Sequence, residues 1–534
     1  MPDVTCDYVV VGAGPAGCVL ASRLSADPAV RVVLLEAGGP DKAREIAVPA
    51  AFSRLFTTGY DWNYRTGKQA GLADRELYWP RGRTLGGSSS INAMMWLRGH
   101  QLDYDEWGRD CPGWSYAEVL PYFHRIERRH GGPAAPVYGA AGPVWISQPR
   151  SVNPATRAFL AACAAAGLPA LGEANEPDNT GYALAPLTQR RGRRWSAADA
   201  YLRPARRRPN LTVLTGALAE RVELDGDRAT GISYRGADGA VHRVTARREV
   251  LLSAGAINSP QLLMLSGIGN PDVLRAAGVE PRHELAGVGE NLQDHLAAGV
   301  NVHCPKPVTM VAAESVGQLA RYLLLRRGML TSNVAEAVAF VRSEPGLPAP
   351  DLEMIFAPAP FMDHGLTPPP GHGLTAGTVL LQPDSRGRVT LGSANPADPP
   401  QIDPGYLTAP ADLTRLVAGV RIAEELLAAE ALREYVGGPM TPYPGTVGTA
   451  ELAQHIRERA ETLYHPVGTC RMGSDPDAVV DPALKVRGLD GLRVVDVSVM
   501  PRINRGHTQA PAYLIAEKAA DLILGHDGPP SAVV

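Results

Sequence analysis

The stretch Asp7-Tyr-Val-Val-Val-Gly-Ala-Gly-Pro-Ala-Gly17 decides the fold. It joins a short β-branched run, which is typical of a buried parallel strand, to three closely spaced glycines. Good helix formers follow, and Arg31-Val-Val-Leu-Leu-Glu36 has the composition of a second buried strand. The order strand, glycine turn, helix, strand predicts a βαβ unit and therefore a parallel sheet.

The glycines have the GxGxxG spacing of a dinucleotide site, in the strand-to-helix context that the motif requires. Gly12 allows the tight turn, Gly14 lets a pyrophosphate approach the backbone, and Gly17 allows close packing of helix on strand. The helix N-terminus stabilises phosphate. Glu36 ends the second strand, where its carboxylate is placed to accept hydrogen bonds from a ribose hydroxyl. The pattern predicts a Rossmann-like domain but does not separate FAD from NAD.

Five further segments settle that choice by resemblance. They are Gly82-Arg-Thr-Leu-Gly-Gly-Ser-Ser-Ser-Ile-Asn-Ala-Met94, Gly255 to Gly269, Gly287 to His295, Tyr464-His-Pro-Val-Gly-Thr-Cys-Arg-Met-Gly473 and Leu492 to Pro501. In this order along the chain they resemble the glucose–methanol–choline (GMC) oxidoreductases, in particular the choline-dehydrogenase-like bacterial branch of alcohol dehydrogenases and oxidases. The resemblance implies FAD, and an alcohol as substrate.

The resemblance also implies an α/β fold, α+β overall. A Rossmann-like FAD-binding domain is expected at residues 1–152, 193–298 and 460–534. An inserted substrate-binding domain, built on an antiparallel sheet with helices, is expected at 153–192 and 299–459. Within the first domain, Pro260 to Gly267 reads as a helix with proline at its first position and glycine at its end.

The segment from Gly82 to Met94 is expected to meet the flavin ring. Gly86 and Gly87 let backbone approach a planar ring, and Ser88 and Asn92 offer polar groups. Some members of the family attach FAD covalently through a histidine of this loop, but Ile91 holds the matching position here and cannot form that bond. We therefore expect non-covalent FAD. The remaining cofactor-binding candidates that the resemblance implies are Arg83, Ala93 and Asp496.

His465 falls at the position of the family's catalytic histidine, although a lone histidine in an apolar stretch is usually structural. Alcohol oxidation by a flavin requires removal of the hydroxyl proton while hydride moves from carbon to flavin N5. A neutral imidazole suits the first task as general base, and the flavin performs the second.

The second catalytic position has two candidates in this sequence. The family usually has asparagine or histidine in a segment like Gly-Asn-Thr-Asn-Ala-Pro, whereas this chain has Gly506-His-Thr-Gln-Ala-Pro511. Gln509 takes the matching place, and its amide can donate a hydrogen bond to the substrate oxygen. His507 is the alternative, and a third interpretation gives His507 a structural role. We favour Gln509. The other histidines, including His295, have no metal-ligand spacing and are interpreted as structural or surface residues.

The bulk composition bounds the remaining possibilities. The 534 residues carry a formal net charge of −3, so nothing demands a nucleic acid partner. The basic runs at 190–194 and 203–208 are interpreted as a solvated face, with phosphate contact as the less favoured alternative. Six widely spaced cysteines favour a reducing compartment. No signal peptide or transmembrane segment is evident, so we expect a cytoplasmic protein, at most peripherally attached.

Two alternatives to alcohol oxidation remain: a lyase of the FAD-containing hydroxynitrile type and a non-catalytic or photochemical flavoprotein. Among oxidised substrates, choline binding favours an aromatic cage, and residues 300–460 contain no tryptophan. We therefore expect an uncharged primary alcohol. Oxygen, a quinone or another carrier are all open as the electron acceptor.

Overall fold

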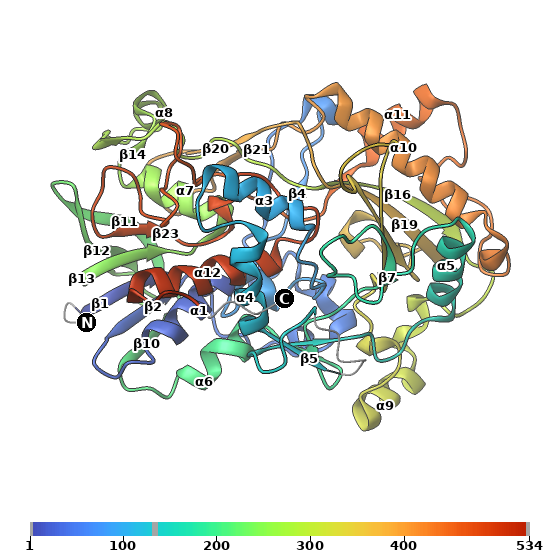
Figure 1. Cartoon of the computed structure of the whole chain (residues 1–534), viewed down its shortest axis with the longest axis horizontal. Coiled ribbons are helices and arrows are strands. Elements are labelled where there is room, and N and C mark those ends of the chain that lie inside the picture. Colours follow the sequence, from blue (N-terminus) through green and yellow to red (C-terminus); the bar gives the residue numbers. More distant parts are fainter. Residues whose placement is uncertain (1–3, 131–136, 530–534) are drawn as a thin grey trace.

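The computed structural model describes residues 4–130 and 137–529, and two sheets lie side by side in it (Figure 1). The first sheet consists of β1 (Val4–Val11), β2 (Val32–Glu36), β10 (Leu211–Thr215), β11 (Leu218–Asp225), β12 (Arg228–Arg235), β13 (Val241–Leu252) and β23 (Leu492–Val494). Its order is β10-β2-β1-β13-β12-β11, with β23 paired to β13. Strands β10, β2, β1 and β13 run parallel to one another. Strand β12 is antiparallel to β13, and β11 is antiparallel to β12.

The predicted βαβ unit forms the centre of this sheet. Helix α1 (Pro15–Leu24) connects β1 to β2, and every residue of β2 is buried. Val11 pairs with Leu35, and the N–H of Gly12 donates to the Leu35 carbonyl at 2.8 Å. This register places the glycine turn beside Glu36, at the carboxyl ends of the strands, where open α/β sheets bind ligands.

The second sheet is antiparallel throughout. Its strands are β7 (Gly181–Leu184), β16 (Leu296–His303), β17 (Ala337–Val341), β18 (Leu352–Ala357), β19 (Gly373–Leu380) and β22 (Glu461–Thr462), in the order β22-β16-β19-β18-β17-β7. Helices α5 (Pro154–Ala165) and α10 (Pro410–Leu427) pack on it. Mostly small residues of three of its strands line a cavity: Ala297, Gly299, Asn301, Ile355, Ala357, Thr375, Gly377 and Val379.

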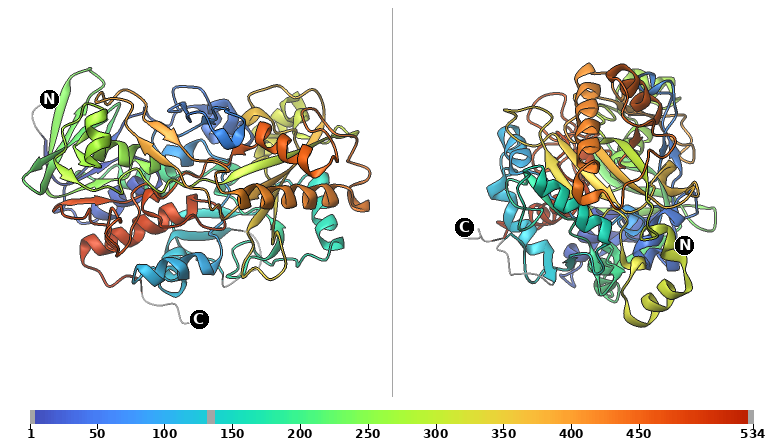
Figure 2. Two further views of the ribbon diagram at one scale, coloured as in Figure 1. Left: turned by 90° about the horizontal axis from the view of Figure 1, so that it is seen from above. Right: turned by 90° about the vertical axis from the view of Figure 1, so that its right-hand side faces the viewer.

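The remaining longer helices surround the two sheets (Figures 1 and 2). They are α3 (Gln101–Asp110), α4 (Tyr116–Ile126), α7 (Gly255–Leu265), α8 (Pro271–Ala276), α9 (Val316–Leu325), α11 (Thr449–Arg459) and α12 (Gln509–Leu524). Strands of the second sheet come from residues 181–184 and 296–462, and the division of the chain into two domains stays a prediction. Within residues 4–130 and 137–529, no helix has the length and apolar composition to cross a bilayer.

One predicted helix begins earlier than the sequence suggested. Helix α7 starts at Gly255, so Pro260 lies inside it rather than at its first position. A proline inside a helix leaves the carbonyl four residues before it without its usual donor. Here the hydroxyl of Thr469 donates to that carbonyl, on Ala256, at 2.6 Å. A distant segment thus satisfies the group that Pro260 frees, which sequence inspection could not show.

The packing of the glycine turn predicts different stabilities for alanine variants at Gly17 and Gly14. A Cβ on Gly17 would lie 1.8 Å from the Gly12 carbonyl oxygen, whereas a Cβ on Gly14 would meet no atom within 4 Å. Gly17→Ala should therefore destabilise the apoprotein by about 1–3 kcal/mol through overpacking, and Gly14→Ala should leave it nearly unchanged. Thermal unfolding of the two apoproteins measures this. Equal unfolding midpoints for both variants would contradict the predicted packing.

Candidate active site

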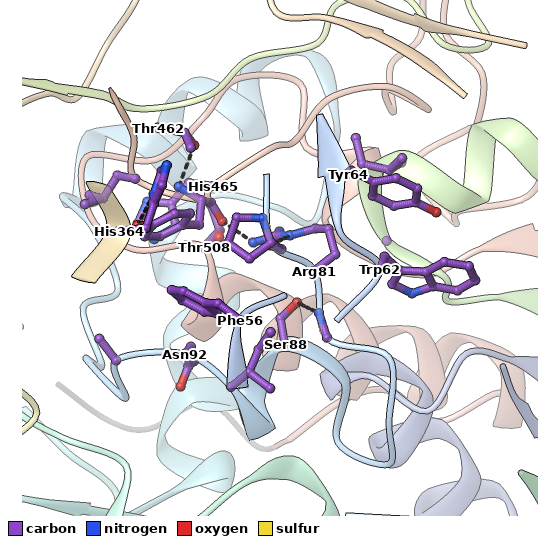
Figure 3. A pocket seen from close by; sticks show the side chains of 18 of the residues that line it. Phe56, Trp62, Tyr64, Arg81, Ser88, Asn92, His364, Thr462, His465 and Thr508 are labelled. Carbon is purple, nitrogen blue, oxygen red and sulfur yellow. Dashed lines mark hydrogen bonds between the residues drawn. The ribbon is translucent and has the colours of Figure 1, made fainter. Parts of the chain in front are cut away.

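A cavity of about 1520 Å³ runs between the two sheets, and segments that lie far apart in the sequence meet in it (Figure 3). Its volume exceeds that of an ordinary small-ligand pocket. Of the predicted site residues, Gly17 and Gly86 are not part of its lining. The others all line it: Gly12, Gly14, Glu36, Arg83, Gly87, Ser88, Asn92, Ala93, His465, Asp496, His507 and Gln509.

The glycine turn and Glu36 form one end of the cavity. Gly12 has a φ of +96°, which explains the requirement for glycine. The Glu36 carboxylate accepts hydrogen bonds from the backbone N–H groups of Ala13 and Gly38, both at 2.8 Å. Burial raises the pKa of Glu36 to about 7. The carboxylate therefore fixes the turn, and each of its oxygens keeps a further lone pair for a ribose hydroxyl, whose binding there stays a prediction.

Several features of this end fit a dinucleotide. The face of Gly14 is open to the cavity, so backbone is accessible to a phosphate. Arg83 Nε and Ser253 Oγ are buried and without a hydrogen-bond partner among the described residues, and both residues line the cavity. Asp496 accepts from the N–H of Gly255 at 2.9 Å and holds the start of α7 against the site. Unpaired buried polar groups of this kind are expected to bind a ligand.

The loop from Gly82 to Met94 has a positive φ at three positions, +87° at Gly86, +51° at Gly87 and +60° at Met94. A Cβ on Gly87 would approach the Cα of Gly14 to 2.7 Å, so this loop packs directly on the dinucleotide turn. Gly86 acts through its backbone rather than as lining. Asn92 is engaged on both sides: it accepts from Arg194 and donates to Gln509, each at 2.7 Å.

His465 follows a strained turn that three groups hold in place. Tyr464 has a φ of +67°, which is costly for a tyrosine. The Asp294 carboxylate accepts from the N–H of His465, and Arg81 donates to the Tyr464 carbonyl, both at 2.6 Å. The hydroxyl of Thr462 accepts from the Tyr464 N–H at 2.7 Å. Strain supported in this way is common at functional sites, and here it aims the imidazole into the cavity.

A row of hydrogen bonds sets the tautomer of His465. His295 Nε2 lies 3.0 Å from the Leu381 carbonyl oxygen, and His295 Nδ1 lies 2.9 Å from His465 Nδ1. A carbonyl accepts only, so His295 carries its proton on Nε2 and its Nδ1 accepts. His465 must then donate from Nδ1, which leaves the lone pair on Nε2. This assignment gives His465 the form of a base without any proton rearrangement.

The protonation of both rings agrees with this assignment. Burial lowers the pKa of His295 to about 3, so it stays neutral. Burial also lowers the pKa of His465 well below the ordinary histidine range, and positive charge on His507 lowers it further. Both imidazoles are therefore neutral near pH 7.

His507 lies against His465, with the ring centroids 4.6 Å apart. Its Nε2 lies 3.2 Å from each carboxylate oxygen of Glu353, which is buried in β18. Gln509 begins α12, and its amide oxygen accepts from Asn92 while its nitrogen lies 3.4 Å from the Thr188 hydroxyl. The structure thus brings His507 to His465 and ties Gln509 to the loop of Asn92.

Sequence inspection missed two partners of these histidines. His295 is fully buried beside His465, so its interpretation as a structural or surface residue was incomplete. Glu353 was not singled out, yet an acidic residue inside the apolar run Leu352-Glu-Met-Ile-Phe356 carried a signal, because buried charges are normally paired. Its partner, 154 positions away, could not be read from the sequence.

The chain belongs to the GMC oxidoreductase family, whose models match residues 6–297 and 383–516. It is 54% identical to an uncharacterized GMC-type oxidoreductase of Mycobacterium tuberculosis, over 98% of this chain and 99% of that one. Identity is 43% both to an alcohol dehydrogenase (acceptor) of Pseudomonas putida, covering 97% of this chain and 95% of the relative, and to a mitochondrial choline dehydrogenase of Mus musculus, covering 97% and 89%.

Among solved structures, pyridoxine 4-oxidase from Mesorbium loti superposes with a TM-score of 0.90 at 36% identity, covering 98% of this chain and 99% of the other. The expected fold is therefore confirmed: a Rossmann-like sheet and a separate antiparallel sheet in an FAD-dependent oxidoreductase acting on CH–OH donors. The family implies an alcohol-type substrate and an electron acceptor.

The lowered pKa of His465 predicts the pH dependence of the reaction. A depressed pKa means that the neutral, proton-accepting form persists as pH falls. The rate of anaerobic flavin reduction should therefore stay level from about pH 8 to about pH 6 and decline only at lower pH. A stopped-flow pH series measures this rate. A decline centred near pH 6.5, the ordinary histidine value, would show that His465 is not shifted or is not the base.

Proposed function

We propose that the protein oxidises a neutral primary alcohol to the aldehyde, with His465 as general base. The observation that carries this proposal is the hydrogen-bond row Leu381–His295–His465, which leaves the Nε2 lone pair of a neutral imidazole at the cavity. That form accepts the hydroxyl proton directly.

Different residues of the cavity would bind FAD and accept the substrate proton. Gly14, Arg83, Ser253 and Glu36 would hold the dinucleotide part of FAD, and the loop around Gly87 would contact its ring. When bound, FAD supplies the hydride acceptor. His465 takes the hydroxyl proton at Nε2, while its Nδ1–H stays bonded to His295 and keeps the ring oriented.

His507 is the better supported neighbour for the substrate oxygen. The carboxylate of Glu353 holds Nε2 of His507 at 3.2 Å, so a protonated ring would have Nδ1–H left to donate to the substrate oxygen as that oxygen becomes negative. Gln509 was favoured on sequence grounds, but its amide oxygen accepts from Asn92 and its amide nitrogen lies 3.4 Å from the Thr188 hydroxyl. We therefore propose His507 as the second catalytic residue, with Gln509 as support for the flavin loop.

The substrate pocket supports an uncharged alcohol with an apolar body. Aromatic side chains such as Phe56 and Phe361 line the cavity, so the absence of tryptophan from residues 300–460 does not by itself exclude an aromatic cage, and the preference for an uncharged alcohol rests on the carboxylates. The carboxylate of Glu353 is paired with His507 and that of Glu461 with Arg75, so neither is free to bind a quaternary ammonium group. Oxygen, a quinone and another carrier are the acceptor classes to test.

The cofactor proposal predicts how FAD is held. Ile91 lines the cavity at the position where a covalent link would form, and its side chain has no nucleophilic atom. Acid precipitation should therefore release yellow FAD into the supernatant. Colour retained in the pellet, or release of FMN, would contradict non-covalent FAD.

The substrate proposal predicts the order of reactivity. Under anaerobic conditions, neutral primary alcohols should bleach the flavin absorbance faster than choline at equal concentration, because the carboxylates of Glu353 and Glu461 are already paired with His507 and Arg75. Faster reduction by choline than by every neutral alcohol would overturn this. A bound substrate that is cleaved without any bleaching would favour the lyase alternative.

The catalytic proposal predicts a rank among three variants. His465→Ala should slow flavin reduction by about 10²–10⁴-fold, since it removes the general base. His507→Ala should cost more than Gln509→Ala, for which the loss of one hydrogen bond, about 1–3 kcal/mol, gives roughly ten- to a hundred-fold. FAD content serves as the control for folding. A crippled Gln509 variant beside a nearly active His507 variant would reverse the assignment.

A further inference from the structure

Helix α9 presents large apolar side chains to solvent. Val316 and Leu324 are 84% and 81% exposed, and Leu319, Leu323 and Leu325 are also largely exposed. Figures 1 and 2 show this helix projecting from the edge of the molecule, away from the sheets. A contiguous exposed patch of this kind is uncommon on a soluble surface and marks an interaction site.

The helix is nevertheless fixed to the body of the protein. Tyr322, its one buried residue, lies 3.4 Å by its hydroxyl from the Ala47 carbonyl oxygen, and the guanidinium of Arg326 lies 4.7 Å from the Tyr322 ring centre. The Met329 N–H donates to the Gln318 side chain at 3.0 Å. The apolar face is therefore held outward by packing on the opposite side.

Arginines converge beside this apolar face. A cavity of about 370 Å³ is lined by Arg150, Arg157, Arg321 and Arg327, and none of the four forms an ion pair with another described residue. Glu336, the acidic residue of the lining, is buried and accepts hydrogen bonds from Ser332, Asn153 and Thr156. The cavity mouth is therefore strongly positive in a chain whose net charge is −3.

The basic run at 190–194 adjoins the same place. Its turn passes through Gly192, where a Cβ would lie 2.8 Å from the Arg326 carbonyl oxygen and 3.3 Å from the Arg150 side chain. Arg191 and Arg193 are exposed on either side of this glycine. The run thus belongs to an arginine cluster built from three separate segments. This cluster favours phosphate contact, which on sequence grounds is the less favoured alternative.

We propose that α9 and this arginine cluster form a docking surface for an anionic lipid bilayer. A helix with exposed leucines flanked by arginines is the pattern of an interfacial helix, which buries its apolar face among the acyl chains while the cations contact lipid phosphates. A second copy is a poorer occupant, because a two-fold interface would place the same unpaired arginines against each other. The surface is independent of the alcohol chemistry and makes the protein peripherally attached.

Vesicle flotation of the FAD-loaded protein tests the proposal. The protein should float with vesicles that contain phosphatidylglycerol and stay down with pure phosphatidylcholine, and raised salt should weaken the binding. Leu323→Ser with Leu324→Ser should weaken binding at least about tenfold. Arg321→Gln with Arg327→Gln should weaken it about thirtyfold.

Matched surface changes elsewhere serve as controls. Val241→Ser alters a valine that is 54% exposed on β13, and Arg275→Gln removes an arginine of α8 whose side chain is 63% exposed; β13 and α8 lie at the opposite end of the molecule from α9 (Figure 1). These variants should bind vesicles like the wild type, and all variants should keep FAD and solution activity. Equal flotation of the α9 variants and the controls would overturn the proposal. A lack of binding to anionic vesicles would also overturn it. A dimer in solution that the leucine changes dissociate would overturn it as well, because the surface would then bind a second copy of the chain.

Discussion

The position of His465, the proposed catalytic base, depends on one row of hydrogen bonds across the antiparallel sheet. Strands β22, β16 and β19 are neighbours, and Leu381 follows β19, His295 precedes β16, and His465 comes shortly after β22. The pairing of Ala297 with Val379 brings His295 opposite Leu381, and the Leu463 N–H donates to the His295 carbonyl at 2.8 Å. Sheet register, more than side-chain choice, therefore sets which nitrogen of His465 is free.

The two histidines at the cavity differ because their outer partners differ. His465 is bonded to a neutral imidazole in a buried place, so the neutral base is favoured. His507 instead has its Nε2 3.2 Å from both carboxylate oxygens of Glu353. The two rings lie 4.6 Å apart, and the proposed function gives them different tasks, one to accept a proton and one to donate to the substrate oxygen.

Local physics explains which features the sequence could predict. The βαβ unit, the glycine turn and Glu36 are contiguous, and their backbone requirements are visible in the residues themselves. The partners of His465 and His507 are not, since His295, Leu381 and Glu353 approach them only through sheet pairing. Gln509 was favoured because it holds the matching position of the family segment and its amide can donate, whereas in the fold Asn92 donates to that amide. Pro260 likewise lies inside a helix with the help of Thr469, whose hydroxyl donates to the carbonyl that the proline leaves free.

Nitrogen-15 NMR of histidine-labelled protein tests the tautomer assignment most directly. With the His295 and His465 signals assigned by substitution, the account predicts a neutral His465 with its proton on Nδ1 and a neutral His295 with its proton on Nε2, unchanged from about pH 8 to about pH 6. A His465 that carries its proton on Nε2, or is an imidazolium in this range, would contradict the role of the Leu381–His295 row in preparing the base.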